Sequence, residues 1–139
     1  MDFCETLSNI NYLAVLVAAL SAFIIGWIWY GPLFAKRWMK LNGFTEESLK
    51  EGAMSMPAIM IINFVAVIVS ALGMAMFLGA ESDMMFGISA GLMIAVFWIA
   101  TSRLNDVLYE KKPFGLFLIN VGYNLVTYAV MGAIIGAWH

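Results

Sequence analysis

Five polar side chains in the last hydrophobic segment repeat at the spacing of a helix face and could bind a small polar molecule. They are Asn120, Tyr123, Asn124, Thr127 and Tyr128, at positions i, i+3, i+4, i+7 and i+8. In a helix this spacing gathers the amide and hydroxyl groups into one stripe, called here the polar stripe. Such groups can replace the hydration of an uncharged or anionic solute. They can also serve only to hydrogen-bond helices to one another, an interaction that contributes about 0.6 kcal/mol in membranes.

An earlier hydrophobic segment carries a similar but sparser polar face. Asn63 and Ser70 share one side of a helix with Ala66 and Gly73. A polar group in hydrocarbon is costly unless it is paired or wetted, so we expect both polar faces to turn toward the bundle interior, a water-filled cavity or a partner subunit. The sequence therefore predicts a solute-binding site or polar core formed by Asn63, Ser70 and the polar stripe.

The residues that catalysis or proton transport would need are absent from these segments. The charge-free runs hold no Asp, Glu, Lys or Arg, and the single His is residue 139. An enzyme is therefore disfavoured, as is an exporter that protonates a membrane carboxylate. The Met residues could offer thioethers to Cu(I), but Met is also an ordinary apolar filler. We expect no catalytic residue, no metal, no cofactor and no nucleic-acid partner.

The segments that must position these side chains follow from the distribution of charge. Of the 139 residues, 63% are hydrophobic and 12% are charged, and every charged residue falls in one of four short stretches. A helix needs roughly 20 apolar residues to cross a bilayer, so each intervening run is long enough for one crossing. We predict an all-α integral membrane protein, a four-transmembrane-helix bundle that forms a single domain over residues 1–139. The expected spans are about 10–30, 56–78, 85–101 and 114–138.

The basic residues predict how the chain is oriented. All seven Lys and Arg lie in the first and third connections between spans. Because cytoplasmic loops carry the excess of basic residues, we expect these connections in the cytoplasm and both termini outside it. The connection over 33–52 is expected to be amphipathic and to lie at the headgroups, although a plain polar loop is the alternative. The expected interfacial anchors are Trp27, Trp29, Tyr30 and Trp38.

Small residues predict which helix faces pack together. Helices in lipid associate by close packing rather than by hydrophobic burial, which favours Gly and Ala four residues apart. The expected packing residues are Ala18, Ala22 and Gly26 in the first span, Gly87 and Gly91 in the third, and Gly132 and Gly136 in the fourth. The Gly132/Gly136 face is also a candidate for self-association, so we expect a homo-oligomer.

The second and fourth spans share a weak similarity. Each opens with a proline, Pro57 or Pro113, and carries an Ile-Asn pair that ends at Asn63 or Asn120. The chain could therefore consist of two helical hairpins in the same orientation. Chance similarity between apolar helices is the alternative.

Three stretches also carry a family resemblance. They are Asn-Tyr-Leu-Ala-Val from Asn11, Trp-Tyr-Gly-Pro-Leu-Phe from Trp29, and the stretch from Pro113 to Tyr123 that contains Phe-Leu-Ile-Asn. Together they resemble the domain-of-unknown-function 1761 family, over nearly the whole chain. The resemblance implies a small bacterial membrane protein with four spans, and it implies no activity.

Two classes of function remain open for this integral membrane protein. It could bind or permeate a small polar solute through the polar stripe. Alternatively, it could be a structural or regulatory partner of another membrane protein, docking by its small-residue faces. The lipid bilayer and further copies of the chain are expected partners in both cases.

Overall fold

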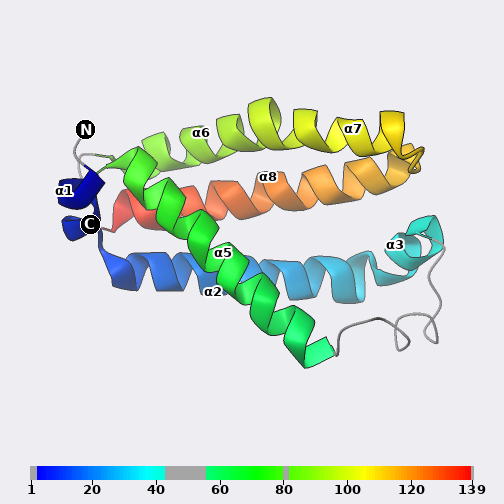
Figure 1. Ribbon diagram of the computed structural model, residues 1–139, viewed down its shortest axis with the longest axis horizontal. Helices are drawn as coiled ribbons and strands as arrows, with labels where there is room; N and C mark the ends of the chain where they lie inside the picture. Colours follow the sequence, from blue (N-terminus) through cyan, green and yellow to red (C-terminus); the bar gives the residue numbers. More distant parts are fainter. Residues whose placement is uncertain (1–2, 43–55, 80–81, 139) are drawn as a thin grey trace.

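The structure, a computed structural model, describes residues 3–42, 56–79 and 82–138 as a set of helices (Figure 1). Four of these helices are long and apolar enough to cross a membrane: Tyr12–Leu33, Pro57–Leu78, Met84–Tyr109 and Phe114–Ala137. A short helix, α1 (Phe3–Ser8), precedes the first of them. The prediction of an all-α bundle with four membrane helices is confirmed.

The first span consists of α2 (Tyr12–Ile28) and a π-helical turn, η1 (Trp29–Leu33). Asn11 begins it, because its Oδ1 accepts a hydrogen bond from the backbone N–H of Ala14 at 3.2 Å. Pro32 lies in the wide turn, where its missing N–H prevents a regular α-helix from continuing. The chain then enters α3 (Ala35–Asn42), which covers the first part of the expected amphipathic connection. Residues 43–52 of that connection lie outside the described residues.

The second span is α5 (Met56–Leu78), and Gly79 follows it with a φ of +75°. That left-handed conformation suits glycine and ends the helix. The third span joins α6 (Met84–Ile94), a second π-helical turn η2 (Ala95–Ala100) and α7 (Thr101–Tyr109) into one helix. It runs beyond residue 101, the predicted end of the span, so Arg103 and Asp106 lie on a helix rather than in a loop.

The fourth span, α8 (Phe114–Ala137), is the central helix of the bundle. It packs against α6 along one side and against α2 along another, while α5 packs chiefly on α2. In Figure 1, α8 lies between the α6–α7 helix and α2, and α5 crosses α2 obliquely. The α2–α5 and α6–α8 pairs are each in contact, but α2 also packs against α8, so the expected division into two hairpins stays a prediction. The buried core draws on all four spans, with Ala18 and Ala22 from α2, Met74 from α5, Ala90 from α6 and Met131 from α8.

Glycine brings the backbones of α6 and α8 into direct contact. A Cβ atom added at Gly87 would lie 1.9 Å from the carbonyl oxygen of Gly132, and one at Gly91 would lie 2.1 Å from that of Tyr128. Gly136 is equally close to the backbone of Asp83. The Gly132/Gly136 face is therefore occupied inside the chain, so it is not available to join two copies as the sequence suggested.

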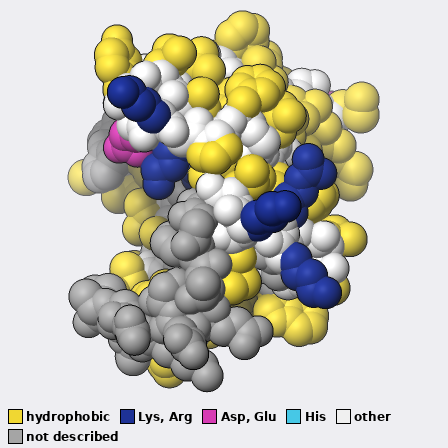
Figure 2. Space-filling view, turned by 90° about the vertical axis from the view of Figure 1, so that its right-hand side faces the viewer, with side chains coloured by type: hydrophobic (Ala, Val, Ile, Leu, Met, Phe, Trp, Pro, Cys, Tyr) yellow, Lys and Arg dark blue, Asp and Glu magenta, His cyan; other side chains and the backbone are white. Residues whose placement is uncertain are grey.

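The basic side chains gather at one end of the bundle (Figure 2). Among the described residues they belong to α3, to α7 and to the turn that leads into α8; they are Lys36, Arg37, Lys40, Arg103, Lys111 and Lys112. Lys50 lies outside the described residues. Helix α1 and the C-terminal end of α8 lie at the opposite end (Figure 1).

Candidate functional site

The polar stripe of α8 turns into the bundle. Asn124 and Thr127 are buried, with 6% and 4% of their surfaces exposed. Asn120, Tyr123 and Tyr128 are half-buried. The stripe is therefore covered by neighbouring helices, as the cost of leaving amides and hydroxyls against hydrocarbon requires.

The end of the stripe nearest the basic residues is hydrogen-bonded to the first span. The Tyr30 hydroxyl donates to Asn120 Oδ1 at 2.7 Å, and Trp29 Nε1 donates to the carbonyl of Ile119 at 3.0 Å. One turn further in, the Tyr123 hydroxyl donates to the carbonyl of Ala22 at 3.4 Å. The rings of Tyr30 and Tyr123 also meet edge to face, with centroids 5.2 Å apart. These contacts fix the register of α2 against α8.

Only part of the expected interfacial belt points away from the protein. Trp27 is 68% exposed, as an anchor in the headgroups would be. Trp29 and Tyr30 instead turn toward α8, and Trp38 of α3 packs its ring edge to face on Tyr30 at 5.8 Å. The indole of Trp29 comes so close to Gly122 that a Cβ there would lie 2.9 Å from its Cζ2 atom. These side chains therefore join helices, and their predicted place at the membrane boundary stays a prediction.

The structure does not bring the polar face of α5 to the polar stripe. Asn63 is exposed and Ser70 is half-buried, while Ala66 and Gly73 beside them are exposed. Asn63 belongs to the N-terminal half of α5, and the oblique crossing of α5 carries that half away from α8 (Figure 1). The two polar faces do not form one site.

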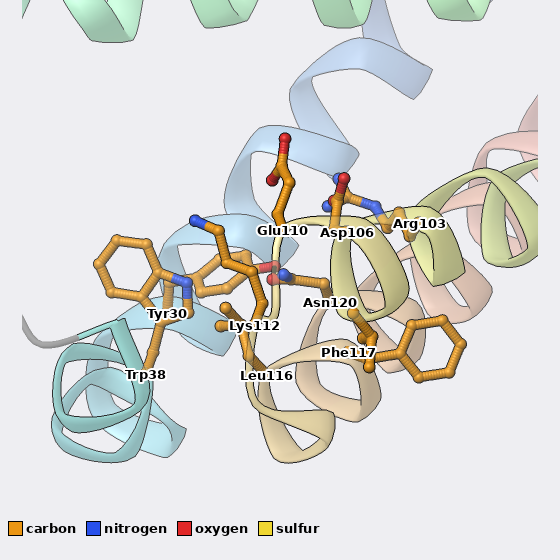
Figure 3. Close-up of a pocket in the computed structure, with 10 residues that line it drawn as sticks. Tyr30, Trp38, Arg103, Asp106, Glu110, Lys112, Leu116, Phe117 and Asn120 are labelled. Carbon is orange, nitrogen blue, oxygen red and sulfur yellow. Dashed lines mark hydrogen bonds between the residues drawn. The ribbon is translucent and has the colours of Figure 1, made fainter.

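A half-open cavity of about 340 Å³ lies where the polar stripe reaches the basic end (Figure 3). We call it the interfacial cavity. Its walls come from η1, α3, α7 and the start of α8; they are Tyr30, Trp38, Arg103, Asp106, Val107, Glu110, Lys112, Leu116, Phe117 and Asn120. Segments far apart in the sequence thus converge on one pocket that combines charged, amide and apolar surfaces.

Charges of both signs surround the interfacial cavity. Arg103 and Lys112 are cationic, whereas Asp106 and Glu110 are anionic, and in the described part of the chain no salt bridge joins any of the four. Asn120 adds an amide whose Oδ1 is already bonded to Tyr30, which leaves its Nδ2 as a donor. Trp38, Leu116 and Phe117 supply apolar walls. This arrangement can bind a molecule that carries a positive group, a negative group and a short apolar part.

Most residues of this cavity were not predicted from the sequence, although the spacing of three charged residues could have indicated them. Arg103, Asp106 and Glu110 have the spacing i, i+3 and i+7, which places them on one face if the helix continues past residue 102. Assigning these residues to a loop concealed their shared face. Asn120 is the one member of the polar stripe that lines the cavity.

Comparison with known proteins gives a match to one family model. The family described as "Protein of unknown function (DUF1761)" matches residues 13–136. Neither a curated protein nor a solved structure matches the chain.

Proposed function

The chain belongs to the domain-of-unknown-function 1761 family, and we propose that it binds a small zwitterionic solute in the interfacial cavity, at the cytoplasmic face of a bacterial inner membrane. The observation that carries this proposal is the set of two cationic and two anionic side chains around one pocket, with the Asn120 amide on its wall. The cationic pair would hold the negative group of the solute and the acidic pair its positive group. The basic end is assigned to the cytoplasm because basic loops are retained there.

The contacts beyond the cavity favour binding over free permeation. The Tyr30–Asn120 hydrogen bond and the Tyr30–Tyr123 ring contact lie between the cavity and the deeper part of the polar stripe. Asn124 and Thr127, further along the stripe, are buried among side chains and do not line the cavity. We therefore propose that a solute is held at the basic end rather than passed along α8.

Calorimetric titration of the purified protein tests this proposal with three probes of similar size. Phosphoethanolamine carries charges of both signs, whereas ethyl phosphate carries only negative charge and ethylamine only positive charge. We expect phosphoethanolamine to bind at least tenfold more tightly than either of the other two probes, because only it satisfies both pairs of side chains. Arg103→Gln and Asp106→Asn should each weaken its binding about tenfold, which corresponds to about 1.4 kcal/mol for a partly exposed charged contact.

Lys40→Gln is the matched control, since it also removes one exposed charge from the same end but does not line the cavity. Binding by this variant should equal that of the wild type. Equal affinity for all three probes, or a loss in Lys40→Gln as large as in Arg103→Gln, would contradict a zwitterion site.

A second candidate function, structural rather than solute-binding, is favoured by the exposed amide of Asn63. It lies within an apolar span, Pro57–Leu78, which has the smallest buried share of the four. An amide is both donor and acceptor, so it can pair with the same amide of a second copy across a two-fold axis. We propose that α5 joins two copies of the chain through Asn63 and Ala66.

Oxidative cross-linking in native membranes tests this pairing on a Cys4→Ser background. Ala66→Cys should give a dimer, because the two-fold axis brings the two positions together and the variant keeps the Asn63 amide. Ile61→Cys is the control: it is 65% exposed but lies on another side of α5. Dimers of equal yield from both variants would indicate random collision, and no dimer from Ala66→Cys would exclude this interface.

A further inference from the structure

Two buried polar side chains at the middle of α8 lack hydrogen-bond partners. Within the described residues, neither Asn124 Nδ2 nor Thr127 Oγ1 has a hydrogen-bond partner within 3.5 Å, although both residues are more than nine-tenths buried. The Tyr123 hydroxyl, one turn before Thr127, interacts with it only at a longer distance. They lie one helical turn apart on the same stripe. Groups of this kind are rarely left unpaired in native proteins, and a membrane interior offers no bulk water to satisfy them.

The neighbouring helices present small side chains at this level. On one side, the Tyr123 hydroxyl reaches the carbonyl of Ala22, whose side chain is fully buried. On the other side, the backbone of Gly91 lies close to that of Tyr128. Because α6 and α8 are antiparallel, the same spacing puts the fully buried Ala95, one turn after Gly91, at the level of Asn124. Ala22 and Ala95 offer methyl groups and no polar atom of their own side chains to the unpaired amide and hydroxyl.

We propose that one water molecule is bound here, between Asn124 and Thr127. The water accepts a hydrogen bond from Asn124 Nδ2 and donates one to Thr127 Oγ1, which supplies the two protein partners that a buried water needs at minimum. Both partners are neutral, and no acidic or basic residue lies in this span, which suits water better than an ion. The site is separate from the interfacial cavity, of which neither residue forms part. This inference therefore does not depend on the proposed solute.

Magnetization transfer from water to side-chain amides, measured by NMR on the ¹⁵N-labelled protein in lipid nanodiscs, tests the proposal directly. We expect a cross-peak between water and the Asn124 amide, assigned by its loss in Asn124→Leu. The amide of Asn120, which lines the open cavity, is the positive control. A water cross-peak at Asn120 with none at Asn124 would overturn the proposal.

The sign of a stability change gives an independent second test. Thr127→Val removes the hydroxyl and keeps the shape of the side chain. If water bridges the two residues, this variant leaves both the water and the Asn124 amide short of a partner, and the unfolding midpoint should fall by about 3 °C. If the site is dry, the variant removes an unpaired hydroxyl and the midpoint should rise, which would contradict a bound water.

Discussion

Replacing Gly87 with alanine is expected to force α6 away from α8 and to destabilise the folded protein by about 3 kcal/mol. The new Cβ would lie 1.9 Å from the carbonyl oxygen of Gly132 and 2.6 Å from its carbonyl carbon. Both are backbone atoms of a central helix, so no side chain can move aside to relieve the overlap. Equilibrium unfolding in mixed micelles, followed by circular dichroism, measures the loss.

Gly73→Ala is the matched control for this substitution. Gly73 also lies within a membrane helix, but no atom lies within 4 Å of its added Cβ. This variant should keep or slightly raise the stability of the wild type, because alanine favours the helix over glycine by roughly 0.5–1 kcal/mol. Equal unfolding curves for Gly87→Ala and Gly73→Ala would show that α6 and α8 are not in backbone contact.

The second large effect is an all-or-none difference in chemical labelling, which tests the proposed orientation. On a Cys4→Ser background, Lys40→Cys and Lys112→Cys report on the basic end, and Ala137→Cys reports on the opposite end. We expect a maleimide that cannot cross the inner membrane to label only Ala137→Cys in intact cells, since basic loops are retained in the cytoplasm. Mass spectrometry of the purified chain measures the labelled fraction.

Breaking the cells provides the control, because all three cysteines should then react. Labelling of Lys40→Cys or Lys112→Cys in intact cells would reverse the proposed orientation. The interfacial cavity would then face the outside of the cell, and its solute would come from there.

The number and order of the membrane helices could be predicted because the length of each charge-free run determines whether it can cross the membrane as a helix. Long charge-free runs cannot remain in water, and their backbone can enter lipid only as helices. The same reasoning did not predict where the third helix ends, because it placed the end of the span at residue 101 and the helix continues to Tyr109. Arg103 and Asp106 lie where headgroups and water can solvate them, so the helix continues through charges that would end a membrane span.

Helix periodicity predicted that the polar stripe would be covered, but it could not identify its neighbours. The pattern in α8 gives a face relative to its own axis, and Asn124 and Thr127 are accordingly buried. The matching face of α5 has an equally regular pattern, yet Asn63 is exposed because that helix crosses the bundle obliquely. Crossing angles depend on contacts between helices, which one helix's sequence does not contain.

The aromatic residues near the end of the first span show a related limit. Composition alone placed Trp29 and Tyr30 at the headgroups, where such side chains are common. Both belong to η1, whose wider turn changes the angle between successive side chains. They point toward Ile119 and Asn120 instead, and the cavity depends on that direction.

The central position of α8 has a consequence for how the protein is made. A nascent chain emerges from the ribosome with its N-terminus first, so α8 emerges after the other three spans. Until then α6 lacks the glycine surface it packs against, and α2 lacks the acceptors for Trp29 and Tyr30. Among the described residues, a nascent chain halted before residue 114 keeps the packing of α5 on α2 and a small contact between α5 and α6. We expect membrane quality-control proteases to degrade such a chain.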